Sequence, residues 1–265
     1  MVKKFLFNTI QTVLEAGKEI LTIYNQDFEI TIKKDQSPVT EADLRAHQII
    51  EPVLQKTGFP VLSEEGHHFS KEERTQWETY WLIDPIDGTK EFINKTDEFC
   101  ICIALIHKRK PILGVLYAPA LQKLYFASEE TGSFLLLNPQ KENKLEKYLS
   151  KSLRLPLQKE VLQNYIFLTS VSFYDKLTKA YVAEVQKKHP NFKEHALGSC
   201  LKLGYFAEGK ASEYTRLFSL KEWDLAAGHA ICKYAGFDVL EFGTKNEIEY
   251  NNADMKVKAF SVKVV

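Results

Sequence analysis

The pattern of apolar and polar positions begins with helical spacing and then changes to alternation. Between residues 5 and 24, apolar side chains recur every three or four positions, which predicts a helix. Alternation between 28 and 32 predicts a short strand. A second helix is expected to begin at Thr40, with Asp43 at capping-box spacing. Pro52 is expected to kink or end that helix.

From Tyr80 onward the pattern is that of short strands separated by turns, which predicts an antiparallel meander with a turn at 109–111. The predicted strands cover 80–83, 99–106, 112–117, 124–127 and 134–137. Residues 138–152 are polar and lysine-rich, which favours a boundary between an N-terminal half, 1–138, and a C-terminal half, 139–265.

Beyond this boundary strands and helices alternate. The predicted strands are 166–169, 212–215 and 237–240, and the predicted helices are 174–187, 200–207 and 224–234. The first half is therefore expected to be α+β and the second half α/β.

Composition limits the class of partner. The chain has 265 residues, 45% of them hydrophobic, which is enough for one large domain or two intimate halves. Its formal net charge is zero, so no basic excess argues for long nucleic acids or an anionic membrane. A small phosphorylated molecule needs only a local positive site. The N-terminus has neither a signal-peptide pattern nor an apolar run long enough to span a membrane.

The four cysteines form no C-x-x-C pair. Cys100 and Cys102 alternate within an apolar strand pattern, so their thiols are expected to lie on one face as buried core groups. Because nothing indicates a disulfide scaffold, a reducing cytoplasm is the expected compartment.

The candidate chemistry lies in a short acidic segment. The apolar strand 81–83 is predicted to stop at Asp84, and Pro85 stiffens the turn that follows. Asp87 falls where a helix N-cap is expected, just before Gly88 and Thr89. Free backbone N–H groups at such a position suit a phosphate.

Three more carboxylates stand at loops or helix starts, namely Asp43, Glu64 and Asp224. Asp43 and Asp224 are each equally well explained as helix caps. Glu65 is expected to be a solvated or supporting charge, and His67-His68 to belong to a polar loop. Oxygen ligands without zinc-spaced histidines favour Mg²⁺ or Mn²⁺.

Several enzyme classes are disfavoured by motif. Haloacid-dehalogenase-type phosphatases carry D-x-D-x-T, whereas Asp84 and Asp87 are three residues apart with a proline between them. The chain has neither G-x-x-x-x-G-K-[ST] nor G-x-G-x-x-G, so kinase, NTPase and dinucleotide-binding functions lose support.

Four ordered motifs carry a resemblance to the inositol monophosphatase superfamily and, within it, to CysQ-type 3'(2'),5'-bisphosphate nucleotidases. They are Ser37-Pro-Val-Thr-Glu-Ala-Asp43, Val61-Leu-Ser-Glu-Glu65, Asp84-Pro-Ile-Asp-Gly-Thr-Lys-Glu-Phe-Ile93 and Trp223-Asp-Leu-Ala-Ala-Gly-His-Ala230. The resemblance runs from near Ser37 to near Gly236 and so covers most of the chain.

The resemblance implies a layered αβαβα sugar-phosphatase fold of class α/β, with two or three Mg²⁺ ions that Mn²⁺ can replace. The implied metal ligands are Glu64, Asp84, Asp87, Asp224 and the carbonyl of Ile86. Asp43 and Thr89 would orient the attacking water, and Glu64 would also take part in catalysis. The implied substrate contacts are Glu64, Ile86, Asp87, Gly88, Thr89, Ser199, Lys202, Arg216 and Asp224.

The sequence is therefore expected to encode an enzyme that hydrolyses the 3'-phosphate of 3'-phosphoadenosine 5'-phosphate to give AMP. Lys90-Glu91 follows the nucleotidase pattern, where inositol monophosphatases usually have Thr-Asn. An Arg and a His of the family pattern are replaced by Val171 and Phe173, which predicts a looser KM, partly offset by stacking of Phe173 on adenine.

The alternatives are an inositol or sugar monophosphate phosphatase and a non-catalytic metal-binding regulator. The protein is expected to be a monomer or a homodimer.

Overall fold

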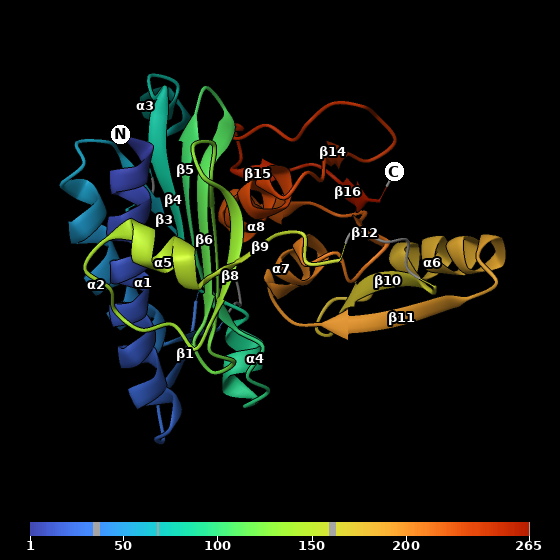
Figure 1. Cartoon of the computed structure of the whole chain (residues 1–265), viewed down its shortest axis with the longest axis horizontal. Helices are drawn as coiled ribbons and strands as arrows, with labels where there is room; N and C mark the ends of the chain where they lie inside the picture. Colours follow the sequence, from blue (N-terminus) through green and yellow to red (C-terminus); the bar gives the residue numbers. More distant parts are fainter. Residues whose placement is uncertain (34–37, 68, 159–162, 265) are drawn as a thin grey trace.

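The computed structural model describes residues 1–33, 38–67, 69–158 and 163–264, and the chain there is arranged in five layers. Two helices, a seven-stranded sheet, two central helices, a five-stranded sheet and one outer helix follow one another across the molecule (Figure 1). This order confirms the predicted αβαβα sandwich.

The first layer consists of α1 (Val2–Tyr24) and α2 (Glu41–Gln55). The apolar stripe of α1 is buried against the sheet, as its spacing predicted. The expectation that Pro52 ends α2 is wrong, because the helix continues to Gln55. Ile50 and Leu54, before and after the proline, are both buried, so packing on the core outweighs the one hydrogen bond that proline removes.

The first sheet confirms the predicted meander. Its strand order is β3-β4-β5-β6-β7-β8-β9, with β3 and β4 parallel and every later pair antiparallel. The strands are β3 (Val61–Ser63), β4 (Thr79–Asp87), β5 (Cys100–His107), β6 (Lys110–Ala118), β7 (Lys123–Ser128), β8 (Gly132–Leu137) and β9 (Leu153–Arg154). The turn between β5 and β6 lies at Lys108 and Arg109, one residue earlier than predicted, and both residues have positive φ, as a tight hairpin requires.

The polar segment 138–152 contains α5 (Leu145–Lys151) and leads into β9. β9 pairs with β8, so the first sheet includes residues on both sides of the boundary drawn at 138/139. The division into two halves stays a prediction.

The second half supplies the inner helices, the second sheet and the outer helix. α8 (Glu222–Tyr234) and α7 (Leu201–Ala207) lie between the sheets, and α6 (Lys176–Lys188) lies beyond the second sheet (Figure 1). Gly114 allows α8 to approach β6 closely, because a Cβ there would lie 2.5 Å from the carbonyl oxygen of Ala227.

The second sheet has the order β11-β10-β12-β16-β14. Its strands are β10 (Tyr165–Ser170), β11 (Phe192–Leu197), β12 (Glu213–Arg216), β14 (Val239–Glu241) and β16 (Phe260–Lys263). β10 is parallel to β11 and to β12, whereas β16 is antiparallel to β12 and to β14. β11 was not predicted, because its side chains alternate between exposed and half-buried without a clear apolar face.

Smaller elements complete the described part of the chain. β1 (Ile30–Ile32) pairs with β2 (Pro38–Thr40), and β13 (Leu220–Lys221) pairs with β15 (Lys256–Val257). The remaining helices are α3 (Lys71–Arg74) and α4 (Thr89–Ile93). Among the described residues, none of the helices is both long and apolar enough for a membrane span.

Candidate active site

The end of β4 shapes the candidate site. The strand was predicted to stop at Asp84. It continues instead to Asp87, with an irregular register between these two residues. Gly88, not Asp87, precedes the first residue of α4, and its φ of 92° is a left-handed value that glycine adopts without strain. The carboxylate of Asp87 is consequently not used as a helix cap.

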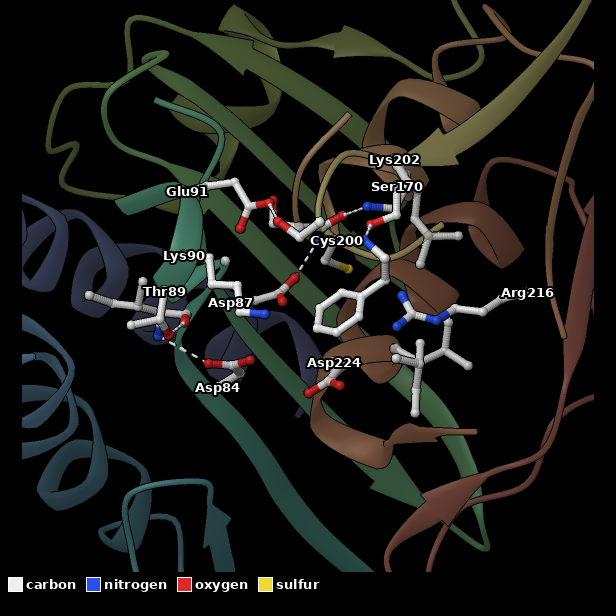
Figure 2. A pocket seen from close by; sticks show the side chains of 18 of the residues that line it. Asp84, Asp87, Thr89, Lys90, Glu91, Ser170, Cys200, Lys202, Arg216 and Asp224 are labelled. Atoms are coloured by element: carbon white, nitrogen blue, oxygen red, sulfur yellow. Dashed lines mark hydrogen bonds between the residues drawn. The ribbon is translucent and has the colours of Figure 1, made fainter. Parts of the chain in front are cut away.

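A cavity of about 230 Å³ opens where β4 meets the central helices. Figure 2 shows Asp84, Asp87 and Asp224 side by side at this cavity, with Arg216 on the side away from Thr89. The sequence-predicted residues that line it are Glu64, Asp84, Ile86, Asp87, Gly88, Thr89, Ser199, Lys202, Arg216 and Asp224. The fold therefore brings segments from both halves of the chain to one place.

Burial makes the acidic residues electrostatically unusual. It raises the pKa of Asp84 well above its ordinary value, and the nearby Glu64, Asp87 and Asp224 add to this. The pKa of Asp224 is raised well above its ordinary value for the same two reasons. For Asp87, burial raises the pKa to about 6, although Lys202 pulls it down. Carboxyls held this close in a dry site favour a bound cation.

Glu64 and Glu65 share one basic partner. The Lys33 ammonium, from the loop after β1, donates to Glu64 at 3.0 Å and also to Glu65. The side chain of Glu65 is only 7% exposed, so the expectation of a solvated charge is wrong and that of a supporting charge beside Glu64 fits. Burial raises the pKa of Glu65, and Lys33 opposes that change.

Asp43 is both a helix cap and a neighbour of the cavity. Its Oδ2 accepts hydrogen bonds from the backbone N–H of Thr40 at 2.8 Å and from the Thr40 hydroxyl at 2.6 Å, which is the predicted capping box. Its Oδ1 lies 3.4 Å from the Thr89 hydroxyl, which also lies 3.3 Å from the carbonyl of Ile86. Burial raises the pKa of Asp43 to about 6. The capping role of Asp43 is therefore confirmed and is compatible with a place beside the cavity, whereas its catalytic role stays a prediction.

A cationic wall lies across from the acids. Lys202 is 3% exposed, and its ammonium donates to the carbonyls of Leu197 at 3.0 Å and Ser199 at 2.6 Å. The Arg216 guanidinium lies 4.2 Å from the ring centroid of Phe218, and its buried Nε has no hydrogen-bond partner among the described residues. Lys202 is therefore not a surface charge.

Phe173 stands at the mouth of the cavity. Its side chain is 50% exposed, and its ring centroid lies 4.6 Å from the Lys90 ammonium and 5.6 Å from the Arg216 guanidinium. Val171 is exposed and does not line the cavity. Of the two replaced positions, only Phe173 therefore faces the site.

Some residues singled out in the sequence lie outside the cavity, and one contact of the site was not predicted. Ser37 and His68 are outside the described residues. His67 packs edge-on against Phe69 and is not among the cavity-lining residues. Sequence reasoning missed the contacts of Lys33, since neither spacing nor charge indicates that this lysine reaches Glu64.

Comparison with known proteins places these observations in a family. A family model described as "Inositol monophosphatase family" matches residues 1–260. The 3'(2'),5'-bisphosphate nucleotidase CysQ of Salmonella typhimurium is 36% identical over 239 residues, which cover 89% of each chain. The CysQ of Haemophilus influenzae is 35% identical over 220 residues, covering 82% of this chain and 77% of that one.

A solved structure is similar to the chain over nearly its whole length. The crystal structure of CysQ from Bacteroides thetaiotaomicron, described as a bacterial member of the inositol monophosphatase family, superimposes with a TM-score of 0.91. It is 38% identical and covers 99% of this chain and 97% of its own.

Proposed function

The chain belongs to the inositol monophosphatase family and is a phosphatase of the 3'(2'),5'-bisphosphate nucleotidase kind, and we propose that it hydrolyses the 3'-phosphate of 3'-phosphoadenosine 5'-phosphate with Mg²⁺-activated water. The products are AMP and inorganic phosphate. The observation that carries the proposal is that carboxylates from separate chain segments share one cavity with two buried or half-buried cations.

The acidic side of the cavity suits a hard divalent ion. Its ligands are the carboxylates of Glu64, Asp84, Asp87 and Asp224 together with the carbonyl of Ile86, all of them oxygen donors. The raised pKa values of the buried acids fit a site that a cation completes. Mg²⁺ bound there, as two or three ions that Mn²⁺ can replace, would lower the pKa of water and stabilise the leaving oxygen.

Asp43 and Thr89 position the attacking water. The Thr89 hydroxyl has one proton, which is directed to Asp43 or to the carbonyl of Ile86, so its lone pairs remain free to accept a hydrogen bond from water. With a pKa of about 6, Asp43 is mostly ionised at neutral pH and can accept a proton through Thr89. Glu64 contributes as a charged neighbour of that water.

The cationic side holds the phosphate that does not react. The Lys202 ammonium has three donors, of which two are used by backbone carbonyls, so one remains for a phosphate oxygen. Arg216 offers a fork of N–H donors at the same wall. Ser199 lines the cavity beside Lys202, and the half-exposed ring of Phe173 provides a face for adenine.

Two other functions remain as alternatives, an inositol or sugar monophosphate phosphatase and a non-catalytic metal-binding regulator. A monophosphate would leave the donors of Lys202 and Arg216 without a phosphate partner. A regulator would not require Asp43 and Thr89 to be placed beside the acids.

Phosphate release with Mg²⁺ and a small substrate panel separates these possibilities. We expect 3'-phosphoadenosine 5'-phosphate to give the highest kcat/KM, ahead of AMP, inositol 1-phosphate and fructose 1,6-bisphosphate. A preference for inositol 1-phosphate would support the first alternative. No release from any substrate would support the second.

A further inference from the structure

A second group of potential ligands lies directly behind the acidic side of the cavity. Cys100 and Cys102 on β5 stand opposite Asp87 and Asp84 of β4 in the strand register. The Cys100 and Cys102 sulfurs are 3.7 Å apart, and the Cys100 sulfur is 4.0 Å from Oδ2 of Asp87. Ligand atoms of Asp87, Cys100 and Cys102 all lie within 4.8 Å of one another.

A third thiol connects this group to the cavity. Cys200 donates its backbone N–H to Asp87. Cys200 also lines the cavity, and Figure 2 shows it next to Asp87. Cys100 and Cys102 themselves are almost completely buried, so an ion would reach them from the side of Cys200.

We propose that Asp87, Cys100 and Cys102 form a binding site for a soft divalent cation such as Zn²⁺ or Cd²⁺. Two thiolates on a tetrahedral zinc ion, each with a bond of about 2.3 Å, are about 3.8 Å apart, which matches the spacing of the two sulfurs. Thiolates favour Zn²⁺ and Cd²⁺ over Mg²⁺, which prefers oxygen ligands. On binding, the two thiols release their protons to solvent, and both thiolates and the carboxylate coordinate the ion.

The site has a consequence for the proposed Mg²⁺ site, because both would use Asp87. A soft ion that engages this carboxylate withdraws it from Mg²⁺, so Zn²⁺ or Cd²⁺ should inhibit hydrolysis. The inhibition rests on the proposed function, whereas the binding does not. Onset should be slow, since Cys100 and Cys102 are almost completely buried.

The test is a titration of the full chain with Cd²⁺ in excess Mg²⁺, followed by thiolate-to-cadmium charge-transfer absorption in the ultraviolet. We expect a saturable band for the wild type and loss of that band for Cys102→Ala, because the variant lacks one of the two thiolates. Cys232→Ala is the matched control. Cys232 is also fully buried, but its thiol donates to the carbonyl of Leu203, outside the cluster.

Cys102→Ser repeats the test with a side chain of similar shape in case the alanine variant does not fold. An equal band in wild type and in Cys102→Ser, no band in wild type, or loss of the band in Cys232→Ala would overturn the proposal. Absorption requires no substrate. A protein that shows the band but hydrolyses no phosphate ester would keep this site and lose the proposed function.

Discussion

The two walls of the cavity differ in what they contribute. The acidic wall, with the buried Asp84 and the half-buried Asp87 at the end of β4, belongs to the larger sheet. The opposite wall carries Lys202 and Arg216 and opens toward the half-exposed Phe173. In the proposed function this difference becomes a division of labour, in which the acidic wall would hold the metal and the cationic wall would select the phosphate ester.

Metal removal should have the largest effect, because in the proposed function every carboxylate of the acidic wall acts through a bound cation. We expect EDTA to reduce phosphate release to background and Mg²⁺ or Mn²⁺ to restore it. Excess Ca²⁺ should inhibit, since it is larger and less strict in its geometry. Full activity in chelator would show that the acids do not act through a metal.

Single changes on the acidic wall should come next. Asp84→Asn and Asp87→Asn are each expected to lower kcat by at least about a thousandfold, roughly 4 kcal/mol of transition-state stabilisation. The exposed Asp238 offers a control, and Asp238→Asn should leave kcat unchanged. Steady-state kinetics with thermal unfolding of each variant would check this. Near-normal turnover in either variant would reduce that aspartate to a structural role.

On the cationic wall, Arg216→Ala should affect substrate choice more than chemistry. Loss of a charge-assisted hydrogen bond, about 1.5–3 kcal/mol, should lower kcat/KM for 3'-phosphoadenosine 5'-phosphate about ten- to a hundredfold. Hydrolysis of inositol 1-phosphate should change little. Equal losses on both substrates would remove the distinction between the walls.

The stability of the metal-free protein should depend on the protonation of the carboxyl groups in the acidic wall. Burial and neighbouring carboxylates raise the pKa values of Asp84 and Asp224 above their unfolded values. Without metal, the folded protein then holds protons that the unfolded chain has released, so stability should fall as pH rises above about 4.

Bound Mg²⁺ removes this penalty, so it should raise Tm more at about pH 8 than at about pH 5.5, by at least about 2 °C. Calorimetry with and without Mg²⁺ at both pH values measures the increment. A larger increment at the lower pH would contradict the role of buried carboxylates.

The smallest expected effect concerns the two positions that depart from the family pattern. The double variant Val171→Arg with Phe173→His should have a KM for the nucleotide that is lower by a few-fold. The change removes a stacking interaction worth about 1–3 kcal/mol and introduces hydrogen-bonding groups in its place. Phe173→His alone should account for most of the change, since Val171 does not line the cavity. An unchanged KM would show that Phe173 does not contact substrate.

The sequence predicted best where a local pattern and the global fold agree. The spacing in α1 and the capping box of Thr40 and Asp43 are local, and both appear in the structure. The length of β4 was not predicted, because Gly88 moves the start of α4 by one residue and Pro85 resembles a strand end.

Contacts between distant segments had no local signal. The pairing of Lys33 with Glu64 and Glu65 depends on how the β1–β2 hairpin lies over the sheet. The burial of Lys202 depends on the carbonyls that the loop before α7 directs toward its ammonium. Spacing and charge reveal neither contact, although both bear on the ion and phosphate binding that we propose for the walls.

The most direct test of the division between the walls is a crystal structure with Mn²⁺, inorganic phosphate and AMP, in which anomalous scattering locates the metal. The account predicts manganese bound by Asp84, Asp87 and Asp224, inorganic phosphate beside it, and the 5'-phosphate of AMP at Lys202 and Arg216. Manganese outside these carboxylates, or the AMP phosphate away from both cations, would contradict it.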